Sequence, residues 1–232
     1  MASYVSSADG GGYPQNPVTV SGHSLAAGDD RIVLAGIALL GPDQTAWDGD
    51  PAYGGVTMNL LRQETVTYYG RELELYVFYL LEGDLPSDGA NSLTYESGSG
   101  PYGSHAIVAS YEDCAQDDPP ADAGQDGFSN PPYSGGTAHT TNITAAASSG
   151  LLVDFFAIEA TGGVIDVGTG QTDRDTGGSG PYINLSDKSF SSSGSNSMEG
   201  EPQSTHDSFS HIIVELADLA TGEESMMFGC NF

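Results

Sequence analysis

The chain has 232 residues, of which 32 are acidic and only 5 are basic, so its formal net charge is −27. Binding to nucleic acid or to an anionic membrane surface needs clustered cations, and this composition argues against both. Repulsion among so many carboxylates would destabilise a compact fold in dilute buffer, but the Debye length is only about 3 Å at 1 M salt. We therefore expect a protein adapted to molar salt, with an acidic mesophilic surface protein as the alternative.

Residues 1–16 are rich in Gly, Ser and Tyr and show no apolar periodicity, which predicts an extended N-terminal arm. They contain neither the basic stretch nor the apolar stretch of a signal peptide. Elsewhere, no apolar run approaches the roughly 18 residues of a membrane-spanning helix. We therefore expect no signal peptide and no transmembrane helix.

Short apolar runs separated by Gly, Pro, Asp and Ser begin at Pro17, and this pattern predicts an all-β fold. Residues 31–40 are apolar on both faces, so we expect a central strand there. Residues 53–61 follow a Pro turn and include two adjacent glycines that suit a tight hairpin. Residues 71–81 begin with alternating Glu and Leu, the pattern of a strand with one buried face.

Five later runs also predict strands, at residues 92–97, 104–111, 137–144, 151–159 and 209–219. The last two would also fit the apolar stripe of a helix, but flanking glycines and the all-β context favour strands. Roughly eight to ten strands result, which suits two packed antiparallel sheets. We therefore predict one antiparallel β-sandwich or jelly roll over residues 17–220, followed by a tail or edge strand at 221–232.

Two long segments predict loops, at residues 113–136 and 169–207, because they are rich in Gly, Ser, Pro or Asp. The first holds carboxylates that could bind Ca²⁺, Mg²⁺ or Na⁺, namely Asp117, Asp118, Asp122 and Asp126. The spacing of an EF-hand is missing, and a solvated acidic loop is the alternative. The tetrapeptide Ser-Gly-Pro-Tyr occurs at 99–102 and again at 179–182, a short internal repeat that would mark equivalent turns.

No histidine accompanies a Ser or Cys in a recognisable nucleophile motif, so we expect no enzyme. His139 and His211 are expected to be structural histidines, and His206 is expected in a surface loop. Histidines and cysteines are too scattered for a zinc site. Cys114 and Cys230 are the only cysteines, and we expect unpaired thiols, with a disulfide as the alternative.

Four segments carry a resemblance to a known family: Asp-Arg-Ile-Val-Leu-Ala-Gly-Ile at 30–37, Tyr-Gly-Gly-Val-Thr-Met at 53–58, and the runs at 74–94 and 150–174. Together they resemble a β-sandwich, jelly-roll-like module that recurs in secreted bacterial and phage-associated proteins. The resemblance implies a β-sandwich without catalytic residues, because such modules decorate surfaces, fibres and particles. With the salt-adapted composition, it predicts a structural protein of a haloarchaeal virus, made in the host cytoplasm and placed on the virion surface as a capsid, decoration, turret or tail protein.

Aromatic and apolar residues in turns and terminal segments are the expected subunit contacts, since Tyr is a large interface anchor with few rotatable bonds. The set is Tyr13, Tyr53, Tyr102, Tyr133, Tyr182, Met226, Met227 and Phe228. The expected partners are further copies of this chain and other virion structural proteins. The alternative is a binding module that recognises a host surface glycan through the same Tyr-rich loops, and a hydrolase has the least support.

Overall fold

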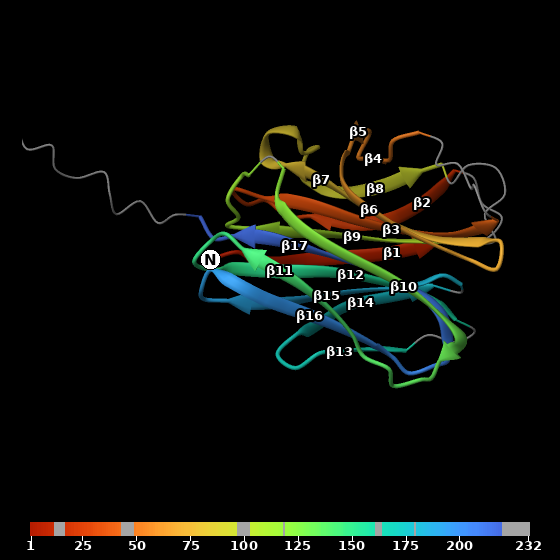
Figure 1. Cartoon of the computed structure of the whole chain (residues 1–232). Helices are drawn as coiled ribbons and strands as arrows, with labels where there is room; N and C mark the ends of the chain where they lie inside the picture. The colour runs from red at the N-terminus through yellow and green to blue at the C-terminus, as the bar shows by residue number, and fades with distance from the viewer. Residues whose placement is uncertain are drawn as a thin grey trace, which may run out of the picture.

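The computed structural model describes residues 1–11, 17–42, 49–96, 103–117, 119–160, 164–178 and 180–219, with the backbone alone at 128–131. Within these ranges the chain is all-β, as predicted, and its central strands are rich in Val, Ile, Leu, Phe and Tyr. One turn of 3-10 helix, η1 (Glu82–Asp84), is the only helix there, and none in these ranges has the length and apolarity to cross a membrane. Figure 1 shows the strands stacked in layers.

The first half of the chain folds into two antiparallel sheets that face each other. The strands are β1 (Ser3–Gly11), β2 (Val18–Leu25), β3 (Ile32–Pro42), β4 (Ala52–Tyr53), β5 (Val56–Thr57), β6 (Asn59–Tyr68), β7 (Arg71–Leu81), β8 (Gly89–Tyr95) and β9 (Gly103–Glu112). An inner five-stranded sheet has the order β1-β9-β3-β7-β6, and a smaller outer sheet has the order β2-β8-β4-β5. Strand β3 lies in the middle of the inner sheet, which confirms the predicted central strand.

The second half also folds into an inner and an outer antiparallel sheet. Its strands are β10 (Ala121–Tyr133), β11 (His139–Ala145), β12 (Gly150–Ala160), β13 (Ile165–Val167), β14 (Thr172–Gly178), β15 (Tyr182–Phe190), β16 (Gly194–Pro202) and β17 (His206–Ala217). The inner sheet has the order β10-β17-β12-β15-β14, and the outer sheet has the order β11-β16-β13. Strands β12 and β17 confirm the strand predictions at 151–159 and, as far as Ala217, at 209–219.

The two halves have the same topology. When β5 and β6 are counted as one strand, each half has eight strands in the described ranges. In each inner sheet the first strand pairs with the eighth, the eighth with the third, and the third with the sixth. The second, seventh and fourth strands form each outer sheet in the same way. This order is that of a jelly roll. The predicted jelly roll is therefore present twice, and the described residues form four sheets rather than the expected two.

The sheets stack in the order outer, inner, inner, outer (Figure 1), and the largest core cluster lies between the two inner sheets. Both halves contribute to it, with Leu34 and Leu75 from the first and Phe155 and Val214 from the second. A Cβ placed on Gly36 would lie 2.1 Å from Cδ1 of Phe155, so this ring packs directly on the backbone of β3. The two halves therefore share one core and cannot separate without exposing it.

The predicted N-terminal arm is a strand over most of its length. Ser3–Gly11 form β1, which pairs with β9 at the edge of the inner sheet, while residues 12–16 lie outside the described ranges. The prediction was wrong for β1 because its side chains are mostly small and polar. A half-buried edge strand does not need the apolar alternation on which the prediction relied.

Both predicted long loops contain strands, so these loop predictions were wrong. Residues 113–136 include β10, which pairs with β17, and residues 169–207 include β14, β15 and β16. Several of these strands lie at a sheet edge or in the outer sheet, where one face meets solvent, so Gly, Ser and Asp are tolerated there. In β16 only the alternate residues Met198, Gly200 and Pro202 are buried.

Candidate functional site

Basic side chains are scarce in this molecule, with five Lys and Arg residues against 32 acidic ones, and all five lie in the described ranges. The four arginines are each held by carboxylates of the same chain: Arg31 by Glu82 and Asp88, Arg62 by Glu64 and Asp122, Arg71 by Glu159, and Arg174 by Asp187. Among the described residues, Lys188 makes no ion pair. It is therefore the one basic side chain whose charge these residues leave uncompensated.

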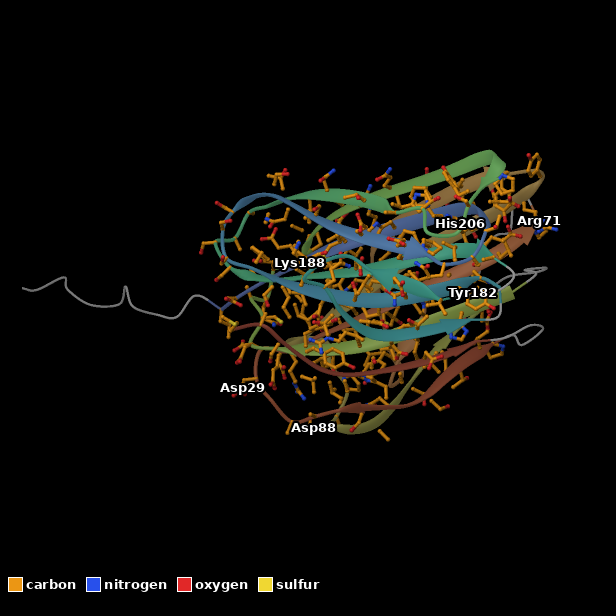
Figure 2. All side chains as sticks on the ribbon, turned by 90° about the horizontal axis from the view of Figure 1, so that it is seen from below. Asp29, Arg71, Asp88, Tyr182, Lys188 and His206 are labelled. Carbon is orange, nitrogen blue, oxygen red and sulfur yellow. The ribbon has the colours of Figure 1, made fainter. Side chains whose placement is uncertain are left out.

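Lys188 lines a cleft of about 520 Å³ at the seam between the two halves. The second half contributes Leu151 from β12, Arg174 from β14, and Asp187 and Lys188 from β15, while the first half contributes Tyr4 from β1. Strand β14 begins opposite Asp187, so the following residues of β15 have no β14 partner and the edge of the sheet is open there. In Figure 2 Lys188 lies toward one end of the molecule, away from Tyr182 and His206.

Arg174 is fixed in one wall of the cleft. Its Nε and Nη2 donate to the two carboxylate oxygens of Asp187 at 2.7 and 3.0 Å, and its Cζ lies 4.4 Å from the centroid of the Tyr4 ring. Burial raises the pKa of Asp187, and the hydrogen bonds from Arg174 oppose that rise. The same hydrogen bonds raise the pKa of Arg174. The guanidinium is therefore a permanent cation held by a bidentate pair and an aromatic face.

Lys188 points to the other side of the strand, because successive side chains of a strand alternate between the faces of its sheet. Its Cε lies 3.8 Å from the position that a Cβ on Gly170 would take, so the aliphatic stem runs along the β13–β14 connection. The residue is partly exposed. A half-buried stem with a free ammonium group suits a mobile donor that can meet an incoming oxygen.

The cleft can hold an anionic group. A carboxylate can accept hydrogen bonds from the Lys188 ammonium, and such charge-assisted bonds are stronger than neutral ones, whereas the charge of Arg174 is already compensated by Asp187. Leu151 also lines the cleft and offers apolar contact. The arrangement therefore suits a carboxylate borne on a larger molecule.

The carboxylates predicted to bind a cation are spread over two elements and partly neutralised. Asp117 is exposed after β9, Asp122 is bound by Arg62 at 2.8 Å, and Asp118 lies outside the described residues. Asp126 follows on the same face of β10, where partial burial and Glu64 raise its pKa. No group of three or more His, Cys, Asp or Glu residues in the described ranges could hold a metal ion.

The predicted interface residues fall into three classes. Tyr53 is fully buried and its hydroxyl lies 2.5 Å from Nδ1 of His23, so its ring cannot contact another subunit in this fold. Tyr133 and Tyr182 are partly exposed and pack against the core of the second half. Tyr13, Tyr102, Met226, Met227 and Phe228 lie outside the described residues. Three apolar side chains that were not among the predicted interface residues are exposed, namely Leu60, Tyr69 and Val164.

A buried histidine cluster lies between the sheets of the second half. His139 Nε2 and His206 Nε2 are 2.8 Å apart, and His211 Nε2 lies 2.9 Å from Asp154 Oδ2. Burial lowers the pKa of His139 to about 4, and His206 and His211 act in the same direction. His206 is buried rather than in a surface loop, which corrects that prediction. The lowered pKa keeps His139 and His206 neutral at pH 7, and the two rings form a polar contact inside the sandwich.

Cys114 is buried and unpaired within the described residues, and its thiol donates to the carbonyl of Glu112 at 3.4 Å. Burial raises its pKa to about 12, with Asp113 and Asp218 adding to the rise. A thiol in this state is unreactive. Cys230 lies outside the described ranges.

Comparison with protein families, with curated proteins and with solved structures finds no match for this chain.

Proposed function

We propose that this chain is a non-enzymatic structural subunit of a particle, a virion of a halophilic archaeal virus, in which it forms or decorates the outer surface. The observation that carries the proposal is the double jelly roll with a shared core between its inner sheets. Jelly rolls are common in viral capsid proteins and in lectins. Fusing two of them through one core gives a rigid block, because neither half can move without exposing apolar surface.

The filling of both sandwiches supports a building block over a ligand-holding barrel. Tyr53, Phe78 and Tyr95 fill the first sandwich, and Phe156 and Phe209 lie in the second. These rings occupy the space in which a barrel of this kind would hold a small molecule. The clefts described for the molecule lie at its surface, where a neighbouring subunit or a glycan can reach them.

The charge supplies the mechanism by which salt controls assembly. Two copies that each carry −27 repel one another over tens of ångströms in dilute buffer, and molar salt reduces that range to about 3 Å. Contacts through buried apolar and tyrosine surface can then form. Salt would therefore act on association between copies as well as on folding.

Light scattering and circular dichroism across a salt series test the proposal. Purified protein should form discrete assemblies at molar NaCl that dissociate as salt is lowered, while the β-sheet spectrum persists into the range where the assemblies are lost. A folded monomer at every salt concentration would contradict it. Binding of that monomer to a glycan array would support the alternative, a surface glycan-binding module.

A further inference from the structure

We propose that the cleft at Lys188 is the place where a second copy of this chain docks a carboxylate, so that Lys188 is the cation of the ion pair between subunits. This inference rests on the proposed function and names a contact that assembly would use. It follows from the distribution of the few basic groups in the molecule.

The arginines are not available for a contact between copies. Each arginine already has a carboxylate partner between 2.5 and 2.8 Å away in its own chain. Using any of them between copies would mean sharing or breaking an existing pair. Among the described residues Lys188 alone has no acidic partner, so it offers a new ion pair without loss of an old one.

Lys188 lines a cleft of about 520 Å³ in which the other two charged side chains, Arg174 and Asp187, form an ion pair with each other. The adjoining edge of β15 is not covered by β14. Partly buried pairs are screened by salt much less than exposed ones. An ion pair formed inside this cleft can therefore persist at salt concentrations that screen repulsion between the subunit surfaces.

The composition of the chain makes a second copy a ready source of carboxylates. A second copy presents 32 acidic side chains and 5 basic ones, so its surface offers carboxylates in nearly every orientation. Carboxylates are exposed on both halves, among them Asp29 on the first half and Asp166 on the second, and none of the described ones forms an ion pair with Lys188. A carboxylate of another copy is therefore the ligand that this cleft meets at the highest local concentration in an assembly.

Zero-length cross-linking with a carbodiimide tests this directly, because Lys188 is the only lysine in the chain. The reagent joins an amine to a carboxylate it already touches, with loss of one water. At molar salt we expect a product with the mass of two chains, in which mass spectrometry finds Lys188 joined to an Asp or Glu of the other copy. The N-terminal amine, 3.8 Å from Asp113, provides an internal control for the reagent.

Three variants at this position separate charge from reactivity. Lys188→Arg keeps the charge and should assemble while giving no cross-link at this position. Lys188→Gln should weaken assembly about tenfold, and Lys188→Glu should weaken it further. Arg71→Gln is the matched control, since it also removes one positive charge but lies outside the cleft and should leave assembly within about threefold of the wild type.

The outcomes distinguish this inference from the proposed function. If the chain assembles but Lys188 links only within its own chain, or not at all, the inference is overturned and the proposed function stands. Equal assembly of Lys188→Glu and the wild type would also overturn it. If the chain stays monomeric at all salt concentrations, both fail. Cross-links between copies at Lys188, together with loss of assembly in Lys188→Glu, would support both.

Discussion

The two halves of the molecule share a topology but fill their sandwiches differently. Between the sheets of the first half lies one apolar cluster with tyrosine rings, and His23 is buried against one of them, Tyr53. Between the sheets of the second half lie two smaller apolar clusters, with a buried histidine pair and an Asp154–His211 pair beside them. The same strand order therefore accommodates different core residues. Because its buried histidines must be protonated at low pH, the second half should be the one that acid destabilises more.

The largest expected effect tests whether the halves fold as one unit. Phe155→Ala removes a ring that packs on Gly36 across the two inner sheets and should lower the free energy of unfolding by about 3–5 kcal/mol. Because the core is shared, the variant should unfold in one transition, like the wild type. Denaturant titration at molar salt, followed by tyrosine fluorescence and by circular dichroism, measures this. Two separated transitions would show that the halves are independent.

The next effect is acid destabilisation of the second half. The pKa of His139 is lowered to about 4, so the unfolded chain binds more protons than the folded chain below pH 6.5, and stability falls as pH drops from 6.5 toward 4. Once the pH is below 4, the full loss of this contribution lowers the free energy of unfolding by about 3 kcal/mol. His139→Phe keeps a ring against Phe209 and should reduce this pH dependence, as measured by unfolding at a series of pH values.

The same substitution in the first half provides the control for that comparison. Burial also lowers the pKa of His23, and a hydrogen bond to the backbone of Ser6 opposes the shift. His23→Phe should therefore change the pH dependence of unfolding in the same direction but by less. A larger effect from His23 than from His139 would reverse the assignment of acid sensitivity to the second half.

The smallest effects compare one arginine in each half. Arg31 donates four side-chain hydrogen bonds, to Glu82, Asp88 and the carbonyl of Ala26, whereas Arg174 donates two, both to Asp187. Arg31→Lys should lower the free energy of unfolding by about 1–2 kcal/mol, because a lysine ammonium cannot make the several directed hydrogen bonds of the guanidinium. Arg174→Lys should lower it by less than about 1 kcal/mol. Thermal unfolding of both variants at one salt concentration would rank them.

The sequence predicted the fold class because the central strands are strongly patterned. Residues 31–40 and 151–159 are apolar on both faces, and both form the middle strand of an inner sheet. Strands β1, β10, β14 and β16 were missed because they lie at an edge or in an outer sheet and few of their residues are fully buried. Strand β15 was missed although it lies inside an inner sheet, because its buried residues include Asn184, Ser186 and Asp187. Strands β1 and β16 have the Ser and Gly content of loops and gain their structure from pairing partners far along the chain.

The duplication could not be seen in the sequence. The Ser-Gly-Pro-Tyr tetrapeptide falls between β8 and β9 in the first half but between β14 and β15 in the second, which are not equivalent positions in the topology. What repeats is the order of pairing, and backbone pairing of this kind is compatible with many sequences.

The candidate site was missed for a related reason. The cleft is lined from β1, β12, β14 and β15, and their convergence depends on the contact between the halves. One signal was available in the sequence, because a single lysine in a chain of net charge −27 stands out as soon as the cations are counted. Its lack of an ion pair, however, depends on which carboxylates the fold brings near it.

Sedimentation velocity in molar salt, over a range of protein concentrations, tests the central claim most directly. We expect a discrete boundary well above that of a 24.0 kDa monomer, which shifts back to the monomer as salt is removed while the strands stay folded. A single monomer boundary under every condition would contradict the claim that this double jelly roll is built to associate with its own copies.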